Sequence, residues 1–148
     1  MHEIGSLLKE QDTAVQVVDK MLANDAFSQW LGIEIVEIGV GRVIIQMRVR
    51  PEMMNGFQMC HGGVTFAFAD SALAFACNSH GRLSVLLTAT MSFPAAVKEG
   101  DTLTAVAVEE SVSNRVGVYS ITVTNDNDEK VGVFQGTVYR TKKSFLSL

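Results

Sequence analysis

The stretch from Val64 to Asn78 is almost wholly apolar, rich in alanine and phenylalanine, and apolar on every face of a helix. A surface helix keeps one polar face, so a helix that is apolar all round is a buried one. A chain of 148 residues can form one domain with a real core and leaves little room for a second. The rest of the chain must therefore wrap around this helix.

The segments on both sides of the helix have the alternating pattern of strands. Candidate strands are residues 33–38 and 42–50 before the helix, and about 84–93, 101–112, 115–124 and 130–141 after it. In the second of these, one face carries Val43, Ile45, Met47 and Val49. The order predicts an α+β domain, in which one antiparallel sheet with its last four strands in a meander curves around the central helix.

A further helix is predicted ahead of this core, over residues 6–30, with Ser6 as a candidate N-cap. Its apolar stripe consists of Leu7, Leu8, Val15, Val18, Leu22 and Phe27. There are only two prolines and no low-complexity tract that would mark a linker. Residues 1–148 are therefore predicted to form a single domain.

Composition narrows the classes of partner. Charged residues make up 19% of the chain, below the roughly 25% that is typical of globular proteins. This shortage indicates that some of the surface is covered by other copies of the chain. The net charge of −4 argues against nucleic acid as the main partner. No segment has the pattern of a membrane span or a signal peptide, so we expect a soluble, cytoplasmic protein.

The cysteines and histidines do not form a metal-binding pattern. Cys60 and Cys77 lie seventeen residues apart without a CxxC pair, and His2, His61 and His80 do not repeat at ligand spacing. We predict no metal site, and reduced thiols at both cysteines, with Cys77 in the core.

Asp70 is the one charge in the apolar helix. Its helical neighbours, at three and four residues, are Phe66, Ala67, Leu73 and Ala74. A carboxylate in these surroundings is costly unless it is hydrogen-bonded, paired or protonated. Two interpretations are open: a structural aspartate bonded to the backbone or to a strand, or a catalytic carboxylate that faces a cleft and whose basicity is raised by apolar walls.

A second candidate feature, Cys60-His61-Gly62-Gly63, directly precedes the helix. Two glycines allow a ligand to approach the backbone closely, and the start of a helix presents unpaired N–H groups that can hold an oxyanion. A Gly-Gly turn and a single histidine are also common as purely structural features.

Gly62 and Asp70 are eight residues apart, which is roughly 12 Å along a helix. A base and an oxyanion hole must both lie about 3 Å from one reacting group. One chain therefore cannot bring them together, whereas a two-fold dimer with antiparallel central helices can. If both features are catalytic, the sequence predicts an obligate homodimer with composite sites.

Together these motifs resemble the hotdog-fold acyl-CoA thioesterases of the phenylacetic-acid degradation (PaaI) type. The resemblance spans about residues 25–141 and is carried by Asn55-Gly56, His61-Gly62-Gly63, Asp70-Ser71 and the Gly100-Asp101 turn. It implies a hotdog fold, an antiparallel sheet wrapped around one long helix, with dimers doubled to a homotetramer. It also implies hydrolysis of an acyl-CoA to a free acid and coenzyme A, with no cofactor beyond the coenzyme A of the substrate.

Carried over position by position, the resemblance makes Asp70 the general base or nucleophile. The Gly62 N–H of the partner subunit would polarise the thioester carbonyl, and Asn55 and His61 would orient water or the thioester. The predicted substrate-binding positions are Gly63, Phe57, Ser71, Phe93, Asn114 and Arg115. The aromatic residues would accept an arylacetyl, hydroxyphenylacetyl or medium-chain acyl group, and Asn114 and Arg115 would lie at the phosphates of coenzyme A. Ser71 is given no chemical role.

Two other functions fit a hotdog domain. A hydratase or dehydratase would call for an Asp-x-Asn-Pro-x-His pattern, whereas Asp70 is followed by Ser71-Ala72. A non-catalytic acyl-CoA-binding module has no need for a lone buried carboxylate such as Asp70. Thiol release from acyl-CoAs separates these functions.

Overall fold

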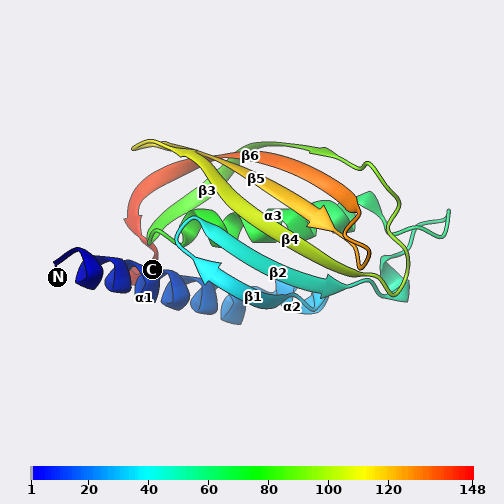
Figure 1. Ribbon diagram of the computed structural model, residues 1–148, viewed down its shortest axis with the longest axis horizontal. Coiled ribbons are helices and arrows are strands. Elements are labelled where there is room, and N and C mark those ends of the chain that lie inside the picture. Colours follow the sequence, from blue (N-terminus) through cyan, green and yellow to red (C-terminus); the bar gives the residue numbers. More distant parts are fainter. Residues whose placement is uncertain (1) are drawn as a thin grey trace.

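The computed structural model describes residues 2–148, and its centre is a helix wrapped by one curved sheet (Figure 1). In chain order the elements are α1 (His2–Asn24), α2 (Ala26–Leu31), β1 (Glu34–Gly39), β2 (Arg42–Arg48), the short 3-10 helix η1 (Pro51–Met53), α3 (Gly62–Asn78), β3 (Arg82–Ser92), β4 (Thr102–Val112), β5 (Val116–Thr124), β6 (Lys130–Ser144) and the 3-10 helix η2 (Phe145–Ser147). This confirms the predicted α+β architecture with α3 as the central helix.

The core lies between α3 and the concave face of the sheet. The inward face predicted for residues 42–50 is confirmed, since Val43, Ile45 and Met47 of β2 and the following Val49 are all buried. On α3, Phe68 and Phe75 are fully buried. A Cβ at Gly136 of β6 would lie 2.9 Å from the Leu73 side chain, so this glycine lets α3 pack closely against the sheet.

Replacing Phe68 by alanine is expected to lower the free energy of unfolding by about 3–5 kcal/mol, because the change leaves a cavity in a close-packed core. Phe27, which is 53% exposed, provides the matched control, and F27A is expected to cost about 1 kcal/mol or less. Urea unfolding of both variants at one protein concentration measures the difference. Equal losses would contradict the assignment of the core.

The strand order corrects one prediction. The six strands are antiparallel in the order β1-β2-β4-β5-β6-β3, so β4, β5 and β6 form a meander but β3 does not join it. β3 pairs with β6 at the opposite edge from β1. The chain then crosses through residues 93–101 to place β4 beside β2. The local alternation of residues 84–93 identified a strand, but it contains no information about which neighbour that strand pairs with.

The N-terminal helix is also different from the prediction. It begins at His2 rather than after Ser6, and it ends at Asn24, where Asp25 interrupts it and caps the separate helix α2. The Asp25 carboxylate accepts a hydrogen bond from the Ser28 N–H, and this arrangement starts a new helix.

The predicted apolar stripe is wrong for the first turns of α1, and also at Val15 and Phe27, which are 36% and 53% exposed. Leu7 and Leu8 are 63% and 62% exposed, whereas Val18 is buried. The buried side of α1 consists of Ala14, Val17 and Val18. Figure 1 shows α1 running along the outside of the domain. None of the helices that the structure describes has the length and apolar character that crossing a membrane requires.

Candidate active site

Asp70 lies in the middle of α3 and is half-buried. Among residues 2–148 its carboxylate has neither a hydrogen-bond partner nor a cation within salt-bridge distance. Burial raises the pKa of Asp70 above its usual value, and the negative charge of Asp25 raises it further. A buried structural carboxylate is normally hydrogen-bonded or paired, and Asp70 has neither kind of partner among the described residues.

One stripe of α3 is incompletely covered within a single chain. It runs along the helix at helical spacing through Phe66, Ala67, Asp70 and Ala74, which are all partly exposed. The other faces of the helix are buried by the sheet and by α1 and α2. Asp70 is therefore accessible from one direction only, and the surface around it is apolar.

The start of α3 provides one free backbone donor. His61 is the N-cap, and its Nδ1 accepts from the Gly63 N–H at 3.0 Å, which places the imidazole proton on Nε2 when the ring is neutral. The Val64 and Thr65 N–H groups donate to the His61 carbonyl. Among the described residues the Gly62 N–H has no acceptor. An unpaired N–H at a helix N-terminus can stabilise an oxyanion.

The loop ahead of α3 is fixed by Asn55. Its Oδ1 accepts hydrogen bonds from the Phe57 N–H at 2.8 Å and the Met59 N–H at 3.2 Å. This arrangement presents Phe57 at the outside of the loop, where its side chain is 82% exposed. Within one chain Phe57 therefore lies at the surface.

Phe93 is next to Gly62. A Cβ built on Gly62 would lie 3.5 Å from the Phe93 ring, and both residues line a cleft of about 330 Å³ at the start of α3. The rest of its lining is mainly apolar and comes from Met59, Cys60, Thr65, Pro94, Ala95, Ala96, Val97 and Val131. The apolar lining of the cleft is of the kind that accepts an acyl group, and Gly62 forms part of this lining.

Ser71 contacts helix α2. It is 8% exposed, and its hydroxyl lies 2.9 Å from that of Ser28, which is 1% exposed. Ser28 in turn contacts Asp25. Asp25 and Ser28 were not predicted as site residues, although Asn24-Asp25 ahead of Ala26-Phe27 is the sequence of a helix N-cap.

Asn114 and Arg115 lie in the turn between β4 and β5, at the other end of α3 from Gly62. Arg82, which follows α3, donates to the Asn114 carbonyl at 2.7 Å. The Arg140 guanidinium donates to the Ser113 carbonyl at 2.6 Å, and the backbone N–H of Arg140 donates to the Arg115 carbonyl. Arg82 and Arg140 thus hold in place the turn that carries Arg115.

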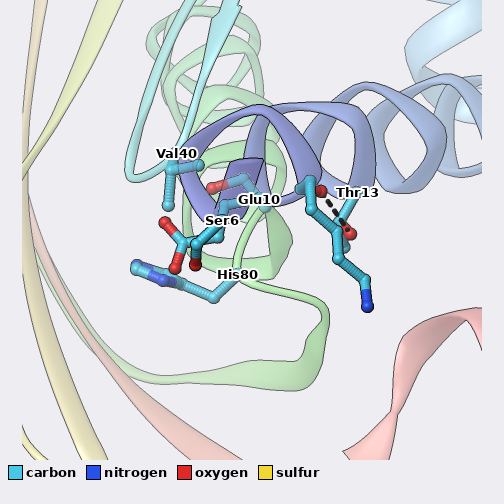
Figure 2. Close-up of a pocket in the computed structure, with 7 residues that line it drawn as sticks. Ser6, Glu10, Thr13, Val40 and His80 are labelled. Carbon is cyan, nitrogen blue, oxygen red and sulfur yellow. Dashed lines mark hydrogen bonds between the residues drawn. The ribbon is translucent and has the colours of Figure 1, made fainter. Parts of the chain in front are cut away.

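A larger cleft, of about 410 Å³, lies under α1 at the C-terminal end of α3 (Figure 2). Figure 2 shows Ser6 and Glu10 of α1 facing His80. His80 Nε2 lies 2.7 Å from Glu109, which also accepts from the Tyr119 hydroxyl at 3.1 Å. None of the predicted site residues lines this cleft.

Cys60 and Cys77 are both buried and free, and Cys77 lies in the core at 2% exposure. Burial raises the pKa of the Cys77 thiol to about 12, so it is neutral at physiological pH. Neither cysteine is arranged as a nucleophile.

The structure does not bring all predicted residues together in one chain. Gly62, His61 and Phe93 gather at the start of α3, and Asn55 lies in the loop that precedes it. Asp70 lies eight residues further along the helix, and Arg115 lies beyond its other end.

Comparisons with known proteins identify the family of the chain. Residues 57–132 match the thioesterase superfamily. The chain is 39% identical to the acyl-coenzyme A thioesterase PaaI of Escherichia coli over 127 residues, which are 86% of this chain and 91% of that protein. The solved structure of the E. coli PaaI protein from the phenylacetic acid degradation operon has a TM-score of 0.89 at 37% identity, covering 90% of this chain and 97% of that one.

A third relative was solved with a ligand. The structure of smu.793 from Streptococcus mutans UA159, bound to acetyl CoA, has a TM-score of 0.74 at 26% identity and covers 76% of this chain and 90% of that one. Sequence, family and fold comparisons thus lead to one assignment. The chain belongs to the thioesterase superfamily, as a hotdog-fold enzyme of the PaaI acyl-CoA thioesterase type.

Proposed function

We propose that the protein hydrolyses an acyl-CoA to a free acid and coenzyme A at sites shared between two copies of the chain. Asp70 of one subunit and the Gly62 N–H of the other act on the same thioester. The observation that carries this proposal is that one helix holds a carboxylate and a backbone N–H that both lack a partner among residues 2–148. Their separation along the helix excludes a common site within one chain.

The chemistry needs only these groups and water. Asp70 takes a proton from water, and the water oxygen bonds to the thioester carbon while the Gly62 N–H holds the oxyanion. The carbon–sulfur bond then breaks, and the coenzyme A sulfur takes the proton that Asp70 holds. Alternatively the Asp70 carboxylate attacks the carbonyl carbon first, coenzyme A leaves, and water hydrolyses the resulting anhydride.

The edge strand β3 supports the two-fold assembly. It borders the sheet beside the open stripe of α3, and Val85, Leu86 and Leu87 on it are 47%, 39% and 57% exposed. A long apolar edge strand is a template for pairing with another copy. Pairing across β3 sets two α3 helices antiparallel, so that Asp70 of one faces Gly62 of the other, and we propose that such dimers pair further into a homotetramer.

The same assembly explains the place of the turn that carries Arg115. With antiparallel helices, the turn at Asn114 and Arg115 of one subunit lies near the start of α3 of its partner. It can then bind the phosphates of a coenzyme A whose thioester is at Gly62. The acetyl CoA found with the Streptococcus mutans relative supports a coenzyme A substrate.

We propose an arylacetyl or hydroxyphenylacetyl group as the acyl part, with medium-chain acyl groups as the other candidates. The cleft of about 330 Å³ between Gly62 and Phe93 has the apolar lining such groups require. The phenylacetic acid degradation operon of the E. coli relative favours the aromatic class. Rates of thiol release on phenylacetyl-, benzoyl- and straight-chain acyl-CoAs rank these candidates.

Mixing two inactive variants tests the shared site. D70N lacks the base, and G62P lacks the N–H donor. If each site takes one group from each subunit, a mixed dimer carries one intact site, and unfolding and refolding an equal mixture restores about a quarter of wild-type activity. If both groups act within one chain, the mixture stays as inactive as its components.

Sedimentation of the mixture gives the control, because it shows that dimers have re-formed. Tight binding of acyl-CoA by the wild-type protein with no thiol release from any substrate would instead identify a binding module. A fully active monomer would remove the shared site from the proposal.

A further inference from the structure

A chain of buried polar groups connects α2 to the turn of α3 that carries Asp70. The Asp25 carboxylate accepts the Ser28 N–H at 3.0 Å and the Ser28 hydroxyl at 2.5 Å. The Ser28 hydroxyl lies 2.9 Å from the Ser71 hydroxyl. A carboxylate only accepts, so Ser28 gives its one hydroxyl proton to Asp25, and Ser71 donates to Ser28.

Capping alone does not explain this arrangement. An N-cap needs the bond from Asp25 to the Ser28 N–H and nothing more. Burying two hydroxyl groups, at 1% and 8% exposure, is costly unless each is satisfied. Here the Ser71 hydroxyl bonds to the Ser28 hydroxyl, which bonds to the Asp25 carboxylate. Ser71 directly follows Asp70 in the chain.

We propose that Asp25, Ser28 and Ser71 are positioning residues for the reaction: their hydrogen bonds fix the turn of α3 that presents Asp70 and hold the Asp25 carboxylate beside that turn. This inference rests on the proposed role of Asp70. We call the three residues the Asp25 relay.

The groups around Asp70 explain why an effect on its basicity is assigned to Asp25. On α3 its neighbours at three and four residues are apolar, and the Cys77 thiol further along is neutral. Besides burial, the charge that raises the pKa of Asp70 is that of Asp25. The nearby cation of α1, Lys20, shares a surface cleft with Asp25, but it donates to the Leu148 carbonyl and lies over the Phe145 ring.

The test separates the effect of the Asp25 charge from the effect of the hydrogen bond between Ser28 and Ser71. D25N and D25S both remove the charge, and serine caps a helix about as well as aspartate. In both variants the acidic limb of kcat/KM is expected to move to lower pH by roughly half a unit to one unit, because a like charge is lost beside the base. S71A keeps the Asp25 charge but loses the hydrogen bond between Ser71 and Ser28. We therefore expect kcat to fall several-fold, while the acidic limb of kcat/KM stays at the same pH.

D126N is the matched control. Asp126 also accepts from a backbone N–H, that of Thr102, but from an exposed turn at the end of the sheet. The pH profile of kcat/KM of D126N should match that of the wild type. Emission from Trp30, the single tryptophan of the chain, reports whether α2 keeps its place in each variant, since Trp30 is on that helix.

Titration of the Asp70 carboxyl by ¹³C NMR, assigned with D70N, gives the same shift without any turnover. If the NMR shift appears in D25N but no acyl-CoA is hydrolysed by the wild type, the relay stands and the proposed function fails. If D25N and D25S fold normally and the Asp70 titration does not move, the electrostatic part of the relay is wrong. Unchanged kcat in S71A overturns the positioning part.

Discussion

Asp70→Asn is expected to lower kcat about 1,000-fold, because asparagine keeps the shape of the side chain but can neither take a proton nor attack a carbonyl. Thiol release from a phenylacetyl- or medium-chain acyl-CoA measures the loss. KM should change little, since the role proposed for Asp70 is to act on water or the carbonyl carbon. D70N activity within tenfold of the wild type would remove Asp70 from the mechanism.

The same variant is expected to be more stable than the wild type at neutral pH. The pKa of Asp70 is raised in the folded state, so the native chain binds the proton more tightly than the unfolded chain. Wild-type stability therefore falls as the pH rises through the window between the two pKa values. The advantage of D70N should be complete above this window and shrink below it. Thermal unfolding at several pH values tests this sign.

Gly62→Pro is expected to lower kcat about 100- to 1,000-fold, the usual loss when one oxyanion donor is removed. Proline removes the backbone N–H and little else at this position. It is favoured as the first residue of a helix, and the preceding His61 already has φ −60° and ψ 131°, which suit a residue before proline. The fold should therefore be kept, as far-UV circular dichroism would show.

Gly62→Ala provides the control for that variant. Alanine keeps the N–H, and its Cβ would lie 3.5 and 3.6 Å from the Phe93 ring, which are ordinary contacts. G62A should retain activity near the wild type. If G62A and G62P lost activity equally, the space at Gly62 rather than its N–H would matter.

Much of the fold could be predicted because it is encoded locally. The alternation of β2 and the wholly apolar α3 identify their elements and their buried faces. The place of β3 could not be predicted, because its pairing with β6 joins segments that are far apart in the sequence. The end of α1 was missed because apolar residues continue at helical spacing past Asp25, whose capping role outweighs them.

The candidate site divides in the same way. Asp70 and Gly62 are conspicuous in sequence, one as a charge in an apolar helix and the other by its place at the helix start. Ser28 and Ser71 carry no such signal, because the bond between them joins residues 43 positions apart. Their contact depends on how α2 packs against α3, which only the folded chain determines.

The place of β3 at the edge also affects how the chain is synthesised. Arg82 pairs with Ser144 and Ser92 with Val133, so β3 leaves the ribosome long before its neighbour β6 exists. Until then Val85, Leu86 and Leu87 lie on a strand with no partner in its own chain, open to other nascent chains. A chain truncated after β5 should therefore aggregate rather than form a weakly active enzyme.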